Sequence, residues 1–201
     1  MNFRQIVGRV WRFIWEDDSV WSWIVNILLA FVLIKFLFYP GIGLLLGTSH
    51  PIVAVVSYSM EHNKDFDSWW TQNGEFYSRL NITKQEFSTY KFKRGFNKGD
   101  IIVLKGAKPK DIKAGDVIVF QTQRPDPIIH RVVREWREDS NYFFQTKGDN
   151  NRASIKDATM DETRVSGQQV IGRAVVKIPW LGWVKILFVE AIQFVGSLFV
   201  S

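Results

Sequence analysis

The first apolar run of the chain is long enough to cross a membrane. From Val20 to Tyr39 the sequence reads VWSWIVNILLAFVLIKFLFY, in which Lys35 is the one charged residue. About twenty helical residues rise roughly 30 Å, which is the thickness of the hydrocarbon layer of a bilayer. We predict a transmembrane helix over 20–39, with Trp21 and Trp23 at one interface and Pro40 ending the regular helix.

A cleavable secretory signal is the alternative interpretation of this run, because Arg4, Arg9 and Arg12 precede it. The run exceeds the roughly 7 to 15 apolar residues of such a signal, which favours a retained anchor. The same arginines indicate that the N-terminal segment 1–19 is cytoplasmic, since positive charge gathers on that side of a membrane. The chain after Tyr39 is then expected to face outward.

Between the anchor and the chain end the hydrophobic pattern is that of short strands. Runs rich in β-branched and aromatic residues alternate with turns rich in Gly, Pro, Asp and Asn. The runs are 53–56, 99–105, 115–122, 128–136, 142–149 and 168–179. We therefore predict a mostly β fold, with an extracytoplasmic β domain over 40–180.

Two further segments do not have this strand pattern. Residues 61–97 carry many aromatic side chains among charges, Trp69 and Trp70 included, and are interpreted as an insertion whose loop packs on the domain or dips into lipid headgroups. Residues 181–201 gather their polar side chains, such as Glu190, on one side of a helix. This amphipathic pattern predicts a C-terminal helix that lies in the membrane interface or forms a second transmembrane span.

Composition excludes several classes of function. The chain has 201 residues, 26 Lys and Arg against 20 Asp and Glu, and a net charge of +6. The chain lacks the concentrated Lys and Arg tract that would indicate nucleic acid as a partner. Its positive charge suits the headgroups of an anionic lipid bilayer. Because there is no cysteine, disulfides, thiolate metal sites and a cysteine nucleophile are all excluded.

The remaining candidate chemistry is that of a serine nucleophile. The stretch VVSYSMEHN, over 55–63, places Ser57 and Ser59 at the end of the first predicted strand. A serine hydroxyl needs a base, and the base needs an orienting group. His130 lies in the strand-like IIHRVV, and Asp149 and Asp157 lie in the turn that follows the next strand. Each residue also has an ordinary structural explanation, as a loop serine, a packed histidine or a turn aspartate.

Six short motifs, in one order, resemble a known family. SYSM, GDIIV, GDVIVF, IIHRVV, TKGDNN and VIGRAVVKIPWLGW are similar to the motifs of type I signal peptidases, specifically the archaeal and endoplasmic-reticulum branch. The resemblance implies a β-rich catalytic domain at the outer membrane face, which cleaves signal peptides from exported preproteins after small residues. It implies no metal or organic cofactor.

The resemblance also implies a role for each candidate residue. Ser59 matches the nucleophile and His130 the general base. Asp149 matches an early aspartate of the family, and Asp157 is the nearest match to the later aspartate that orients the histidine. Ser57 matches the residue whose hydroxyl, with the backbone N–H of Ser59, forms an oxyanion hole.

The sequence departs from the family at His62, which stands where proline usually follows, and at the insertion 61–97. His62 is an alternative base. Two other functions remain open: a metal-dependent hydrolase, against which the absence of an HExxH spacing counts, and a non-enzymatic, membrane-tethered β domain that binds peptides in a secretion complex. Expected partners are preproteins, the bilayer and a translocon or accessory subunits. The expected location is an archaeal plasma membrane, or the endoplasmic reticulum of a eukaryote.

Overall fold

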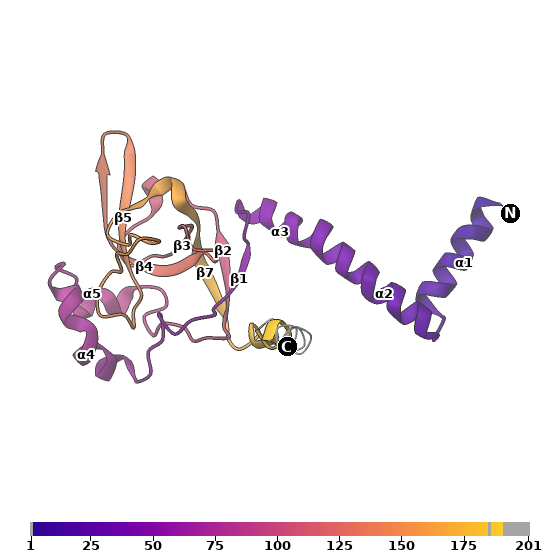
Figure 1. The fold of residues 1–201 in the computed structure, drawn as a ribbon, viewed down its shortest axis with the longest axis horizontal. Coiled ribbons are helices and arrows are strands. Elements are labelled where there is room, and N and C mark those ends of the chain that lie inside the picture. The colour runs from indigo at the N-terminus through magenta and orange to yellow at the C-terminus, as the bar shows by residue number, and fades with distance from the viewer. Residues whose placement is uncertain (1, 185, 191–201) are drawn as a thin grey trace. The chain divides into compact units, whose positions relative to one another are not determined.

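A computed structural model describes residues 2–184 and 186–190 of the chain (Figure 1). The chain divides into two compact units, Met1–Leu45 and Leu46–Ser201. The first unit is helical. Its elements are α1 (Phe3–Trp15), α2 (Val20–Leu33), a π-helical turn (Ile34–Phe38) and α3 (Tyr39–Leu46), whose last residue falls in the second unit.

Polar side chains of α2 hold the end of α1. The Oγ atom of Ser22 donates to the carbonyl of Phe13 at 2.6 Å, and the amide of Asn26 donates to the carbonyl of Ile14 at 2.9 Å. The last carbonyls of a helix have no partner within the helix, so these two bonds satisfy acceptors that the helix itself leaves unpaired. Ser19 caps the start of α2 by accepting from the backbone N–H of Ser22 at 3.2 Å.

One continuous helical stretch has the length and composition of a membrane span. It runs from Val20 to Leu46 and reaches a mean hydropathy of 2.2, with none of its most apolar part buried. The prediction that Pro40 ends the helix is wrong, because the helix continues beyond it. The π-helical turn over Ile34–Phe38 ends two residues before Pro40, and such local adjustments accommodate a proline that lacks an N–H donor.

The second unit contains the predicted β fold. Among the described residues, seven strands form one antiparallel sheet in the order β1-β2-β7-β3-β4-β5-β6. The mostly β prediction is confirmed, and only the short β6 has no counterpart among the predicted runs. The strands are β1 (Ile52–Ala54), β2 (Ile101–Lys105), β3 (Val117–Phe120), β4 (Ile128–Glu138), β5 (Asn141–Lys147), β6 (Val165–Ser166) and β7 (Val170–Ile178). Short 3-10 turns lie at Pro109–Asp111 and Gly167–Gln169.

Strand β4 is covered on both faces at its centre. Four consecutive residues, His130 to Val133, are buried, although side chains alternate between the faces of a strand. Val132 packs in a cluster with Phe144 of β5, whereas Val133 packs in a separate cluster with Trp69. A bulge between Val132 and Arg134 shifts the register against β5. The polar side chains of this strand are therefore enclosed from two sides.

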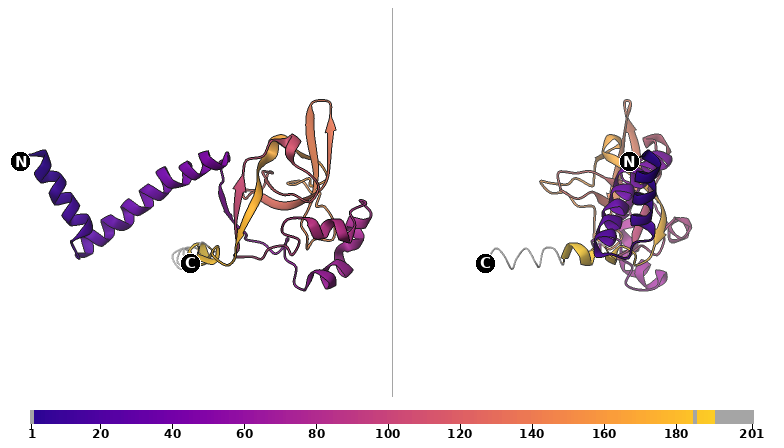
Figure 2. Two further views of the ribbon diagram at one scale, coloured as in Figure 1. Left: turned by 180° about the vertical axis from the view of Figure 1, so that it is seen from behind. Right: turned by 90° about the vertical axis from the view of Figure 1, so that its right-hand side faces the viewer.

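The aromatic-rich insertion folds into two helices rather than a loop. Helix α4 (Phe66–Ser78) begins at the N-cap Asp65, and α5 (Lys84–Thr89) begins at the N-cap Thr83. Both lie together beside β4 and β5, as Figures 1 and 2 show, away from the tip of the β4–β5 hairpin. Trp69, Tyr77, Ile82 and Phe87 form the buried cluster that also contains Val133. Trp69 therefore packs on the domain, which is the first of the two expectations for this segment, and does not dip into lipid headgroups.

The predicted C-terminal helix over 181–201 lies largely outside the described residues. Trp183, Val184 and residues 186–190 are helical. The indole of Trp183 lies against Gly99, where φ is +90° and an added Cβ would come within 2.1 Å of the ring nitrogen. The start of this helix is thus attached to the β domain.

Candidate active site

Ser59 lies in a short irregular segment between β1 and the insertion, with its backbone fixed on both sides. Its carbonyl accepts from the N–H of Asn150 at 2.8 Å, and the neighbouring Met60 is buried and accepts from the N–H of Phe96 at 3.0 Å. The Oγ atom of Ser59 lies 2.9 Å from Nε2 of His130 and 3.1 Å from Oγ of Ser57. A serine hydroxyl therefore meets an imidazole at hydrogen-bond distance, as activation by a base requires.

His130 is oriented by a buried glutamate. Its ring is at the centre of β4, opposite Ile118 of β3, and is 4% exposed. Nδ1 lies 2.5 Å from Oε1 of Glu162, which is fully buried. When Nδ1 carries the hydrogen of the neutral ring and donates a hydrogen bond to this carboxylate, Nε2 is unprotonated. Nε2 can then accept the hydroxyl proton of Ser59. The three side chains form a continuous Ser-His-Glu hydrogen-bond chain.

Glu162 itself is held by the end of β5 and by the chain that returns toward it. Its Oε1 accepts from Oγ1 of Thr146 at 3.0 Å, and its Oε2 accepts from the N–H of Ile155 at 2.8 Å. Its backbone is also paired, since the N–H of Thr146 donates to its carbonyl at 2.8 Å. Both carboxylate oxygens are therefore satisfied, which a buried carboxylate requires.

Asp149 belongs to a different buried group beside the Ser-His-Glu chain. It accepts two hydrogen bonds from Arg131, at 2.9 Å to Oδ1 and 2.6 Å to Oδ2. Tyr77 donates to Oδ1 at 2.9 Å, and Nε2 of His62 lies 3.1 Å from Oδ2. Lys147 lies next to this group and donates to the carbonyls of Gly148 and Asp149, both at 3.1 Å.

Burial and charge act in opposite directions on these groups. Burial raises the pKa of Asp149, but the charge of Arg131 and the hydrogen bonds from His62 and Arg131 outweigh it, so the pKa of this carboxyl lies below its ordinary value. Burial lowers the pKa of Lys147 to about 8, against the opposing effect of Asp149 and Glu162. Asp149 is consequently the ionised partner of Arg131 throughout the neutral range.

No family model matches the chain, but comparison with known proteins finds relatives of similar sequence. The signal peptidase complex catalytic subunit SEC11 of Scheffersomyces stipitis is 28% identical over 162 residues, which is 79% of this chain and 78% of that protein. SEC11 of Colletotrichum graminicola is 28% identical over 169 residues, or 81% and 80% of the two chains. SEC11C of Homo sapiens is 28% identical over 152 residues, 74% of this chain, and the match spans 62% of the human protein.

This chain is a relative of the SEC11 signal peptidases. The resemblance inferred from its six motifs is thereby confirmed, as is the branch to which it points. The alternative of a non-enzymatic β domain is not favoured, because the relatives are named as catalytic subunits.

In this SEC11 relative, three of the predicted site residues come together. Ser57, Ser59 and His130 are joined by hydrogen-bond distances, whereas the carboxylate of Asp149 bonds Arg131, Tyr77 and His62 and not the imidazole of His130. Asp149 instead reaches the side chain of the residue after Ser59, because its backbone N–H donates to Sδ of Met60 at 3.3 Å. His62, the alternative base, bonds to Asp149 and not to Ser59.

The geometry contradicts the prediction that Asp157 orients His130. Asp157 is exposed to solvent, where Oδ2 binds Arg124 at 2.7 Å and Oδ1 accepts from Oγ1 and the N–H of Thr159, both at 2.7 Å. These local hydrogen bonds cap a turn, the structural alternative noted from the sequence. The same contacts lower the pKa of Asp157 to about 2.

Sequence reasoning missed Glu162, which takes the place expected of Asp157. It follows Asp157 closely, in MDETRV, so it was a candidate for the orienting group, but nothing in this stretch of sequence distinguishes it from Asp157. The buried partners of Asp149 were also missed. Arg131 directly follows His130, and a charged residue inside a strand-like run is a sign of a buried ion pair.

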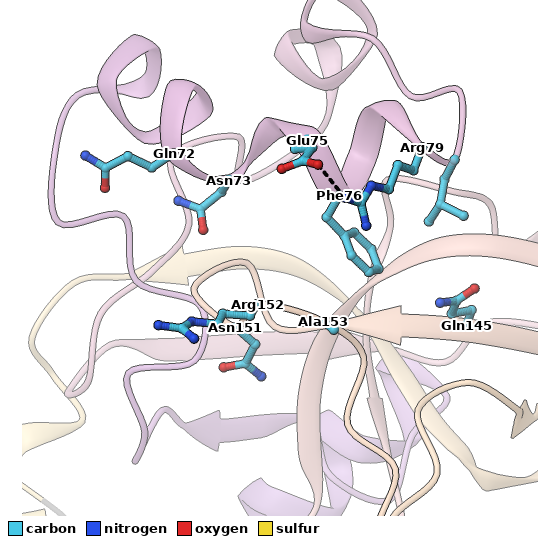
Figure 3. A pocket seen from close by; sticks show the side chains of 10 residues that line it. Gln72, Asn73, Glu75, Phe76, Arg79, Gln145, Asn151, Arg152 and Ala153 are labelled. Carbon is cyan, nitrogen blue, oxygen red and sulfur yellow. Dashed lines mark hydrogen bonds and ion pairs between the residues drawn. The ribbon is translucent and has the colours of Figure 1, made fainter.

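A pocket of about 560 Å³ lies between α4 and the loop 151–153. Figure 3 shows Gln72, Asn73 and Phe76 of α4 on one side, facing Asn151 and Arg152 on the other. The ion pair between Glu75 of α4 and Arg79, the residue that follows this helix, borders the pocket. Ser59, His130 and Glu162 do not line this pocket, so it does not include the Ser-His-Glu hydrogen-bond chain.

The histidines do not form a shared metal site. Within residues 2–184 and 186–190, no group of three or more His, Asp or Glu side chains is arranged to hold a metal ion. Each histidine has its own partner: Nδ1 of His50 lies 2.9 Å from Oγ of Ser49, His62 binds Asp149, and His130 binds Glu162.

Proposed function

We propose that this chain is a membrane-anchored serine endopeptidase that removes signal peptides from exported preproteins after small residues. Ser59 is the nucleophile, His130 is the general base, and Glu162 orients and stabilises His130. The observation that carries the proposal is the Ser59–His130–Glu162 chain, with distances of 2.9 Å and 2.5 Å, in a relative of signal peptidase catalytic subunits.

Acylation follows from this geometry. Oγ of Ser59 attacks the scissile carbonyl while Nε2 of His130 takes the hydroxyl proton. The imidazolium that forms is stabilised by the buried carboxylate of Glu162 beside Nδ1. When the tetrahedral intermediate collapses, Nε2 gives its proton to the leaving amine, and the signal peptide remains as an ester on Ser59.

Deacylation uses the same groups in reverse. His130 takes a proton from water, the resulting hydroxide attacks the ester, and the released Ser59 recovers its proton. The oxyanion in both steps is assigned to the Oγ of Ser57 and the backbone N–H of Ser59. Ser57 supports this role by position, since its Oγ is 3.1 Å from that of the nucleophile.

The apolar helix Val20–Leu46 provides the anchor. A signal peptide that is still inserted in the bilayer presents its cleavage site near the membrane surface, so an anchored protease meets its substrate there. The relatives named as subunits of a signal peptidase complex support the assignment of accessory subunits as partners. The organisms of these relatives favour the endoplasmic-reticulum membrane as the location of this chain. An archaeal plasma membrane is the alternative location.

Cleavage of a preprotein with a small-x-small site, by the full chain in lipid, tests this function. We expect cleavage by the wild type, by a chelator-treated sample and by Ser88→Ala, a matched control in α5 whose Oγ bonds only the carbonyl of Gln85. Ser59→Ala is expected to show no cleavage above background. Cleavage by Ser59→Ala would overturn the nucleophile, and loss of activity on chelation would favour a metal-dependent hydrolase.

A further inference from the structure

The insertion 61–97 contributes half of the contacts to the buried carboxylate of Asp149. Oδ1 is shared by Tyr77 and Arg131, and Oδ2 by His62 and Arg131. Tyr77 belongs to α4, and His62 belongs to the segment that leads into it. The side chains of Tyr77 and His62 are 0% and 1% exposed, so these bonds are shielded from water.

Packing within the insertion fixes both donors. The His62 ring stacks on Trp69 with centroids 3.7 Å apart and planes inclined by 8°. The ring of Tyr77 packs edge-on against Phe87 at 4.9 Å. Because aromatic rings in a close-packed cluster have few alternative rotamers, the hydrogen-bonding atoms of His62 and Tyr77 are held in place.

The insertion also holds the arginine that pairs with Asp149. The guanidinium of Arg131 donates to the carbonyls of Lys91 and Phe92, at 3.0 Å and 2.9 Å, and lies 4.7 Å from the ring centroid of Phe87. The fully buried Arg131–Asp149 pair is thus enclosed by the insertion on the face of β4 that does not carry His130.

The loop that contains Asp149 supports the nucleophile from behind. The N–H of Asn150 donates to the carbonyl of Ser59 at 2.8 Å, and its side-chain amide donates to the carbonyl of Tyr58 at 3.1 Å. Gly148 fits so closely that an added Cβ would lie 2.8 Å from both the Ser59 carbonyl oxygen and Nε2 of His130. Any displacement of this loop therefore moves the Ser59 backbone relative to the imidazole.

We propose that Tyr77 and His62 are positioning residues for the reaction, and that the insertion acts as a brace of the active site. They act through Asp149 and the loop 148–150, which sets the position of Ser59 against His130. This inference rests on the proposed function, because it assigns its effect to the attack of Ser59. Neither side chain touches the reacting atoms, and the brace is a feature of this chain's own insertion.

Tyr77→Phe is the most direct variant, because it removes one hydroxyl and keeps the ring. Tyr90→Phe is the matched control: it removes a hydroxyl from the same insertion, but that hydroxyl bonds Glu86 at 2.8 Å and not Asp149. We measure kcat and KM for preprotein cleavage by the full chain in lipid, together with the thermal unfolding midpoint. A misplacement of reacting groups by a fraction of an ångström to 1 Å lowers rate by roughly 10 to 100-fold.

The proposal predicts that Tyr77→Phe lowers kcat about tenfold or more with KM within about twofold of the wild type, while Tyr90→Phe keeps both constants. Equal kcat values for Tyr77→Phe and Tyr90→Phe, in an active wild type, would overturn the brace and leave the serine peptidase intact. No cleavage by the wild type would overturn the proposed function and the brace with it.

A second pair of variants keeps the proposal testable if Tyr77→Phe does not fold. His62→Gln retains an N–H donor for Asp149, whereas His62→Leu has none. The brace predicts that kcat falls about tenfold more in His62→Leu than in His62→Gln, at similar KM. Equal kcat values for the two would show that His62 has only a packing role.

Discussion

At the scale of single residues, the buried pair of Asp149 and Arg131 stabilises the fold around the site. Both side chains are fully buried, and the pair is bidentate. Removing one member of such a pair leaves a buried charge without its partner, at a cost of about 3 to 5 kcal/mol. We expect Asp149→Asn to lose stability of this size, as measured by chemical denaturation in mild detergent. A loss below about 1 kcal/mol would contradict the buried-pair interpretation.

The same carboxylate makes folding sensitive to acid. Its pKa is lower in the folded chain than the ordinary value of 3.8, so its contribution to stability is complete above that pH and is lost as the pH falls toward the folded-state pKa. We expect the unfolding midpoint of the wild type to fall steeply below about pH 4, and that of Asp149→Asn to fall less. Parallel curves for the two proteins would exclude Asp149 as a source of the acid sensitivity.

Sequence reasoning predicted that Ser59 and His130 come together, but not which carboxylate bonds the imidazole. Ser59 and His130 are recognisable because each is embedded in a motif whose order is informative. The choice between Asp157 and Glu162 depends on how the chain turns after β5, where Asp157 caps the turn through Thr159 and Glu162 points back to β4. Such a turn is set by long-range packing, and no local pattern of the sequence specifies it.

At the scale of elements, the strands followed from runs of β-branched and aromatic residues separated by turn residues, whereas the helices of the insertion were not predicted. Their aromatic side chains pack against one another and against Val133 of β4 in a separate buried cluster. The hydrophobic pattern of this segment therefore reflects contacts within the insertion as well as contacts with the sheet. The caps were the usable signal: Asp65 precedes α4, and Thr83 precedes Glu86 in the T-x-x-E order that starts many helices. Cap residues would have been a better guide than the aromatic content.

Burial of Trp69 predicts that α4 is part of the folded domain rather than a lipid contact. Trp69→Ala removes a ring that is 3% exposed and should cost about 3 to 5 kcal/mol of stability. Trp180→Ala, at a ring that is 73% exposed, is the control and should change stability by less than about 0.5 kcal/mol. Equal effects of the two substitutions on chemical denaturation would mean that the insertion does not pack on β4.

At the scale of the whole molecule, the proposed function requires the apolar helix Val20–Leu46 to anchor the chain in a membrane. Ile27 and Phe31 are exposed on the apolar helix, and arginine near the centre of a span costs roughly 2.5 to 3.5 kcal/mol per residue. We expect the wild type to stay in the membrane fraction after an alkaline wash. The double variant Ile27→Arg and Phe31→Arg should be released, and its retention would contradict the anchor.

The most direct test of the Ser59–His130–Glu162 assignment compares kcat for preprotein cleavage by Glu162→Gln and Asp157→Asn in the full chain. Glutamine keeps the shape of Glu162 but cannot stabilise the imidazolium of His130, so we predict a loss of at least about 100-fold. Asp157→Asn, at an exposed turn, should remain within about twofold of the wild type. The reverse result, a silent Glu162→Gln beside a disabled Asp157→Asn, would contradict the Ser59–His130–Glu162 assignment.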